Sequence, residues 1–131
     1  HLEIVTPEQK TYADDVDSVV IPGVEGELGV LPQHVPLMTQ LLPGELRVMK
    51  GGEELRLAVG EGFVEITADK VAVLTDMAVK ESDIDESAAE DAVRRAEDAM
   101  KDNKLGGEEY ATVKASLQKS LALVRVKRRR S

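Results

Sequence analysis

Cysteine is absent from this 131-residue chain, and aromatic residues are nearly absent. Without cysteine the chain can form neither a disulfide bond nor a thiolate metal site, and a reducing compartment is allowed. The aromatic residues are Tyr12, Phe63 and Tyr110. We therefore expect a core of valine, leucine, isoleucine and alanine side chains, in one ordinary domain or two small ones.

Long apolar runs are also missing. No segment approaches the roughly 20 consecutive apolar residues of a membrane-spanning helix, and no secretory signal peptide is visible. Direct membrane insertion is therefore not predicted. The sequence starts at His1 rather than at a methionine, and we expect a residue or two to have been removed before it.

The residue combinations that catalysis needs are scarce. His1 and His34 are the histidines of the chain, and two histidines without a suitably spaced partner do not make a zinc site. No nucleophile–base pair and no Gly-x-x-x-x-Gly-Lys-Ser/Thr phosphate loop occurs. The sequence thus predicts no catalytic residue, metal or cofactor. A small β-sandwich enzyme acting on an acyl or sugar substrate is the least favoured interpretation.

The charge is unevenly distributed. The formal net charge is −8, but residues 125–131 carry five bases and no acid. An acidic body with a basic end predicts an acidic partner. The residues alone also allow a solvated terminus whose cations suit the dipole of a helix C-terminus. Nucleic acid is not favoured as the partner, because the body is acidic and no aromatic residue is interleaved with the bases.

Residues 1–80 show the patterns of short strands. Polar and apolar residues alternate on both sides of Gly51 and Gly52, which is a strong β-hairpin signal. A second hairpin is expected from residues 63–67 and 71–75. Alternation of period two with closely spaced turns favours an antiparallel sandwich.

From Ser82 the apolar spacing changes to three and four residues, which predicts helices over about 85–102 and from Glu108 onward. The first expected stripe is nearly all alanine: Ala88, Ala89, Ala92, Val93, Ala96, Ala99 and Met100. The second is Tyr110, Val113, Leu117, Leu121 and Val124. Small side chains bury little area, so we expect a marginally stable hairpin that could detach.

These patterns predict an α+β fold. An N-terminal antiparallel β-sandwich over residues 1–81 is followed by a C-terminal antiparallel two-helix hairpin over residues 82–131. Within the first part, Glu27 and His34 lie in a stretch whose glycines and prolines set tight turns. Polar side chains on rigid loops suit docking to another protein rather than bond-making chemistry.

Three stretches resemble the epsilon subunit of the bacterial and chloroplast F-type ATP synthase. They are EGELGVLPQHVPL at 25–37 with Pro43-Gly44 after it, GEGFVE at 60–65 followed by VAVLT at 71–75, and SDID at 82–85 with ALVRV at 122–126. The resemblance implies a non-catalytic rotor subunit on the cytoplasmic face of the bacterial plasma membrane, or on the stromal side in a chloroplast. Its contacts would be the gamma subunit, through His34, and the ring of c subunits, through Glu27.

The resemblance also implies that the hairpin is regulatory. Extended along gamma, it would block ATP hydrolysis and set Lys127, Arg128, Arg129 and Arg130 against an acidic segment of the catalytic beta subunits. The coupling of proton-driven rotation to ATP synthesis would be the main function. The alternative is a free-standing interaction adaptor outside a rotary motor, which would not co-purify with gamma and the c ring.

One departure concerns nucleotide binding. Some members of the family bind ATP through Ile/Leu-Asp-x-x-Arg-Ala, and the matching residues 84–89 here read IDESAA. Ala88 replaces the arginine, and a second expected arginine is Leu121. Each lost charge-assisted contact is worth ~1.5–3 kcal/mol. With Asp85 and Arg125 alone retained, we predict no tight ATP binding.

Overall fold

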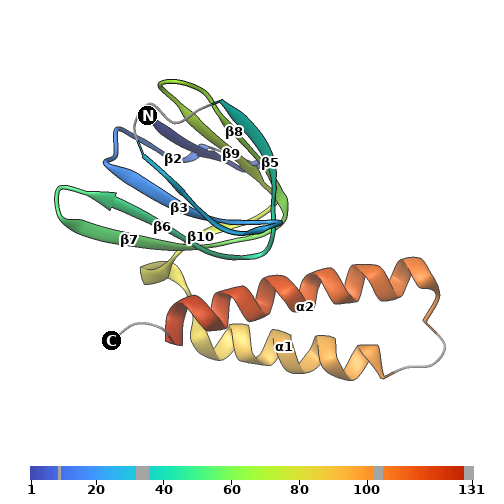
Figure 1. Cartoon of the computed structure of the whole chain (residues 1–131). Coiled ribbons are helices and arrows are strands. Elements are labelled where there is room, and N and C mark those ends of the chain that lie inside the picture. Colours follow the sequence, from blue (N-terminus) through green and yellow to red (C-terminus); the bar gives the residue numbers. More distant parts are fainter. Residues whose placement is uncertain (9, 32–35, 102–104, 129–131) are drawn as a thin grey trace.

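The computed structural model describes the whole chain except residues 9, 32–35, 102–104 and 129–131. Within this part, strands come first and helices last (Figure 1). The strands are β1 (Leu2–Val5), β2 (Lys10–Asp14), β3 (Ser18–Gly23), β4 (Gly26–Val30), β5 (Leu37–Leu41), β6 (Gly44–Lys50), β7 (Glu53–Val59), β8 (Gly62–Ile66), β9 (Val71–Thr75) and β10 (Ala78–Lys80). A 3₁₀ turn, η1 (Glu81–Asp83), leads to α1 (Glu86–Met100) and α2 (Gly107–Arg128). The predicted α+β fold is confirmed.

The strands form one hydrogen-bonded path that folds over into two layers. Its order is β10-β7-β6-β3-β5-β8-β9-β1-β2, with β4 paired to β3. The two layers face each other in Figure 1. The path passes from one layer to the other between β3 and β5, which pair at Gly23↔Leu41. The pairing is antiparallel as predicted, except that β1 runs parallel to β9.

The predicted hairpins are present. Strands β6 and β7 pair from Gly44↔Val59 to Lys50↔Glu53 and leave Gly51 and Gly52 as the loop. The φ angles of these glycines are 60° and 81°, as a two-residue turn with positive φ at both positions requires. The other predicted hairpin is β8–β9.

The core between the layers is aliphatic. Its fully buried members come from both layers, for example Leu46 and Leu57 from one and Ile4 and Val64 from the other. In β1 and β8 the buried residues alternate with more exposed ones. The last three residues of β7 are all buried, because Leu57 and Val59 belong to the core and Ala58 to a cluster with α2. The prediction of a core without aromatic residues is confirmed for the part of the chain that the structure describes, since the buried clusters contain only Leu, Ile, Val and Ala.

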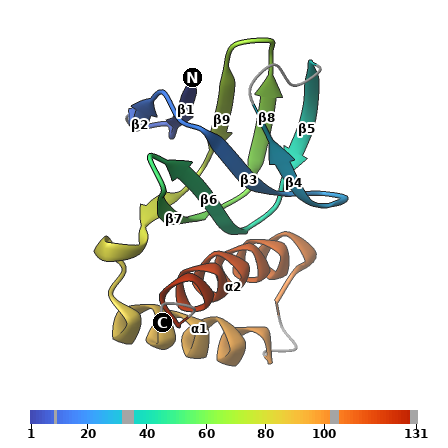
Figure 2. The same ribbon diagram turned by 60° about the vertical axis from the view of Figure 1, so that its left-hand side comes forward.

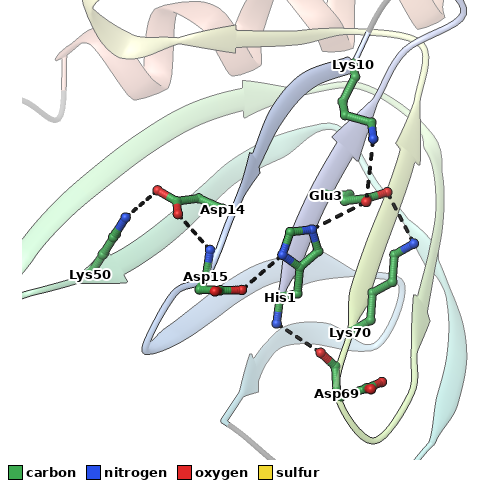
Figure 3. A network of polar contacts seen from close by, with 8 residues as sticks. All are labelled: His1, Glu3, Lys10, Asp14, Asp15, Lys50, Asp69 and Lys70. Atoms are coloured by element: carbon green, nitrogen blue, oxygen red, sulfur yellow. Dashed lines mark hydrogen bonds and ion pairs between the residues drawn. The ribbon is translucent and has the colours of Figure 1, made fainter.

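Polar contacts join the strands at the N-terminal end of the sandwich (Figure 3). The Glu3 carboxylate lies 3.2 Å from Lys70 Nζ and 3.6 Å from Lys10 Nζ. The hydrogen bond from Lys70 holds the pKa of Glu3 below its ordinary value, against the opposing effect of burial. Asp14 on β2 pairs with Lys50 on β6, and that bond lowers the pKa of Asp14 and raises the pKa of Lys50. The pair of Asp14 and Lys50 ties β2 to β6, which do not follow one another in the chain, and Glu3 links β1 to β2 and to the β8–β9 loop.

Helix α1 begins where the sequence predicts. Asp85 is its N-cap, and Asp85 Oδ1 accepts a 3.1 Å hydrogen bond from the Ala88 backbone N–H. Of the expected stripe, Ala89 and Ala96 are buried. Ala88 is exposed, so including it in the buried stripe was wrong.

The expected stripe of α2 was partly wrong. Val124 is buried, but Tyr110 and Leu121 are about two-fifths exposed. The reason is that α2 packs against α1 on one side and against β6 and β7 on another. A helix with two contact faces buries small residues that a single-stripe pattern overlooks, here Ala122 and Val126.

The helical hairpin is folded against the sandwich (Figure 2). Ala58 of β7 points away from the aliphatic core and forms a second buried cluster with Ile84, Ala122 and Val126. Met77, Val79 and Leu123 pack around this cluster. The C-terminal half of α2 therefore rests on the outer face of β6 and β7, while the N-terminal end of α2 extends beyond the sandwich in Figure 1.

Candidate docking surfaces

The first candidate surface is the tip of the β3–β4 hairpin, which carries Glu27. Gly26 begins β4 with φ 112°, a conformation open to glycine and strained for other residues. Glu27 follows it, opposite Pro22 in the register. Its side chain is 59% exposed, and Glu27 Oε2 lies 3.3 Å from Arg47 Nη2. The sequence thus correctly singled out an exposed acid on a turn, and the structure adds the arginine beside it.

The second candidate surface is an exposed apolar patch on the outer face of the layer formed by β5, β8, β9 and β1. Phe63 is directly opposite Leu74, and Leu74 is directly opposite Val5. Met38 lies on the same face, two residues along β5 from Gln40, which is directly opposite Phe63. Met38, Phe63 and Leu74 are 65%, 57% and 51% exposed. Contiguous exposed apolar side chains of this kind mark interaction sites.

Sequence reasoning missed this apolar patch. The residues come from four strands, and only the strand register brings them together on one face. A signal was nevertheless present, because Phe63 is the chain's single phenylalanine and it alternates with the buried Val64 along β8. His34, which was predicted to contact a partner, lies outside the described residues.

The third candidate surface is the basic end of α2. Lys127 Nζ donates a 3.2 Å hydrogen bond to the backbone carbonyl of Glu81. Arg128 Nη2 lies 2.6 Å from Glu90 Oε1, and Arg128 Nε lies 3.5 Å from Glu86 Oε1. The bond to Glu90, helped by Glu86, raises the pKa of Arg128. In the folded hairpin these two bases are therefore engaged by acidic residues of their own chain.

Arg129 and Arg130, the other two bases predicted to meet an acidic partner, lie outside the described residues. A further cation on α2, Lys119, reaches the sandwich directly, since Lys119 Nζ lies 2.8 Å from Asp76 Oδ2. This contact joins α2 to the segment between β9 and β10.

The residues predicted for weak nucleotide binding are not assembled by any contact among the described residues. Asp85 uses its carboxylate to cap α1. Arg125 lines a hollow of about 370 Å³ between α2 and the β5–β6 turn, together with Leu42, Pro43 and Leu121. Leu121, which stands where an arginine was expected, is therefore next to Arg125 in the same hollow.

Two features are absent from the described residues. None of the helices there combines the length and the apolar character that a membrane span requires. No group of three or more histidine, cysteine, aspartate or glutamate side chains there could hold a metal ion.

Comparison with known protein families matches the entire described range of this chain. Residues 1–81 match the beta-sandwich domain of the ATP synthase delta/epsilon chain, and residues 82–128 match its long alpha-helix domain. The ATP synthase epsilon chain of Dehalococcoides mccartyi is 43% identical over 129 residues, covering 98% of this chain and 92% of that one. The epsilon chain of Alkalilimnicola ehrlichii is 42% identical over 134 residues, covering 98% and 95%.

Solved structures share the fold. A chain of the Euglena gracilis mitochondrial ATP synthase, in a complex of OSCP, F1 and c-ring, superposes with a TM-score of 0.79 at 24% identity, covering 93% of this chain and 77% of that one. A chain of the central stalk and c-ring of the Tetrahymena thermophila mitochondrial ATP synthase superposes with a TM-score of 0.63 at 14% identity, covering 96% and 94%.

Proposed function

The chain belongs to the ATP synthase delta/epsilon chain family, and from that premise we propose that it is a non-catalytic subunit of the central stalk. In this role it binds the gamma subunit and the ring of c subunits and turns with them, so that proton-driven rotation is coupled to ATP synthesis. It is a peripheral component on the cytoplasmic face of the membrane. Residues 1–81 are the docking domain, and residues 82–131 are the regulatory domain.

The observation that carries this proposal is the pairing of two different exposed surfaces on one rigid sandwich. The apolar patch of Met38, Phe63 and Leu74 is suited to a protein partner that covers it permanently, which we assign to gamma. The Glu27 tip is polar and exposed, which suits the polar loops at the end of a membrane ring. His34 is assigned to the gamma contact as well.

The helical hairpin is proposed to inhibit ATP hydrolysis after it detaches and extends. The small buried cluster around Ala58 supports this, because few large side chains hold the hairpin in place. Extension would release Lys127 and Arg128 from their intrachain carboxylates and make them available, with Arg129 and Arg130, to acidic segments of the beta subunits.

The test is ATP hydrolysis by the catalytic head with gamma bound, measured as the full-length chain is added. In a matched form, Asp76→Cys and Lys119→Cys are joined by a short bis-maleimide, which holds the hairpin on the sandwich. The chain has no native cysteine that could compete for the cross-linker. Inhibition by the free chain and none by the cross-linked chain is expected. If both forms bind equally and neither inhibits, the chain is a rotor subunit that does not inhibit ATP hydrolysis. If neither form binds, the proposed function is overturned.

A further inference from the structure

Two arginines face each other on the outer side of β6 and β7. Arg47 and Arg56 are directly opposite in the register, an arrangement that repels unless each cation has its own carboxylate. Arg56 Nε lies 3.8 Å from Glu54 Oε1. Arg47 instead bridges two acids, because its Nη1 lies 3.4 Å from Glu45 Oε1 and its Nη2 lies 3.3 Å from Glu27 Oε2.

One end of this bridge is buried. The Glu45 side chain is only 5% exposed. Glu45 is directly opposite Ala58 in the register, and Ala58 packs against Ala122 and Val126 of α2. Helix α2 therefore covers the face on which Glu45 lies. A buried carboxylate needs a close cation, so the contact between Glu45 and Arg47 is expensive to break.

The other end of the bridge is free to meet a partner. The guanidinium group is planar and holds its N–H groups in a fixed fork. When Glu45 fixes Nη1 of Arg47, the direction of Nη2 is fixed as well, and with it the position of the Glu27 carboxylate that Nη2 contacts. Glu27 is more than half exposed, and without this support it would lose side-chain entropy each time it docked.

We infer that Arg47 is a positioning residue for Glu27: anchored by the buried carboxylate of Glu45, it holds the Glu27 side chain ready for docking at the tip of the β3–β4 hairpin. The inference rests on the proposed function for the identity of the partner. The ordering of Glu27 by Arg47 is a property of the chain alone and can be tested without a partner.

The binding test is a double-mutant cycle on the complex of gamma and the c ring. Arg47→Lys keeps a positive charge beside Glu45, so the fold is retained. It removes the planar guanidinium group that contacts both acids. It is expected to weaken binding about twofold to fivefold, the size of a partly exposed ion-pair effect. The same change in a Glu27→Gln background is expected to have no effect. Arg56→Lys, at the directly opposite position, is the matched control and is expected to leave binding unchanged.

The second test uses the isolated full-length chain. Nuclear magnetic relaxation of the Glu27 side-chain methylene groups is expected to show restricted motion, and greater motion in Arg47→Lys and in Glu45→Gln but not in Arg56→Lys. Equal mobility of Glu27 in all four proteins would overturn the inference, and so would an equal loss of binding from Arg47→Lys in both backgrounds. If Glu27→Gln leaves ring binding intact while Glu27 is ordered by Arg47, then the assigned docking role of Glu27 is wrong and the positioning role stands.

Discussion

Arg128 Nη2, at the end of α2, lies 2.6 Å from Glu90 Oε1 in α1. The two residues are 38 positions apart in the sequence, and their contact closes the open end of the helical hairpin beside the sandwich. The same arginine reaches Glu86 one turn away on α1. Arg128, which was expected to contact an acidic partner, thus pairs with acids of its own chain while the hairpin is folded.

Removing the two acids should therefore favour detachment of α2 from α1, which extension of the hairpin requires. In Glu86→Gln with Glu90→Gln, we expect the population with α2 detached from α1 to rise about twofold to fivefold, as for other exposed ion pairs. Pulsed electron spin resonance between labels at the exposed positions Arg95 and Lys114 would measure it, since the chain has no native cysteine. High salt should reduce the difference between variant and parent.

The control for this experiment is Glu97→Gln, an exposed position on the same helix. It changes the net charge of α1 without removing a carboxylate that contacts Arg128. An increase in detachment as large as that in the double variant would contradict a specific role for Glu86 and Glu90.

Val126→Ala should loosen the hairpin more than the sandwich. Val126 is fully buried in the cluster with Ala58 and Ile84, and losing two methyl groups there costs about 1.5–3 kcal/mol. Hydrogen exchange should speed up along α2 and much less along β6 and β8. Leu121→Ala is the matched variant, because Leu121 is partly exposed and should have a smaller effect. Equal acceleration throughout the sandwich would show that the cluster supports the whole fold.

Glu3→Gln should make the free energy of unfolding less dependent on pH in the acid range. The native pKa of Glu3 lies below its ordinary value of 4.5, chiefly through the hydrogen bond from Lys70. The unfolded chain then binds a proton more readily than the folded chain. The stability that ionised Glu3 contributes to the folded chain is fully present above the ordinary pKa. It is lost as pH falls through the lowered native pKa.

Chemical denaturation from pH 7 to pH 2 would measure this effect. The parent and Glu3→Gln should differ most at neutral pH and converge in acid. Glu65→Gln, two strands away in the same layer, serves as the comparison. A constant gap between parent and Glu3→Gln across the pH range would contradict the assignment.

ATP should bind weakly, and restoring two arginines should strengthen it. Ala88→Arg with Leu121→Arg supplies the two missing cations, each worth ~1.5–3 kcal/mol in a charge-assisted contact. Leu121 lines the same hollow as Arg125, so the second substitution puts its charge beside the retained one. Calorimetry of both proteins with ATP gives the dissociation constants, and a micromolar value for the unmodified chain would refute the prediction.

Several features could be predicted from local sequence because they depend on local backbone preferences. Gly51 and Gly52 adopt positive φ at little cost, so they predicted the β6–β7 turn. Asp85 is followed by helix-forming residues, and its carboxylate caps α1. Glu27 was recognised as exposed because it lies between turn-forming glycines.

The contacts between distant segments could not be predicted in this way. Periodicity alone placed Leu121 in the buried stripe, whereas the packing of α2 on two neighbours leaves it partly exposed and buries Ala122 and Val126. The apolar patch of Phe63 and Leu74 exists only because the register sets them opposite each other.

The amino-acid sequence by itself determined the turns, the ends of α1 and the change from strand to helix, since each depends on the dihedral preferences of a few adjacent residues. Only the tertiary structure decided that Arg47 bridges Glu45 and Glu27 and that Arg128 pairs with Glu90. Those pairs depend on strand register and on the seating of α2 against the sheet, which arise from the burial of many side chains at once and leave no mark in any short stretch of sequence.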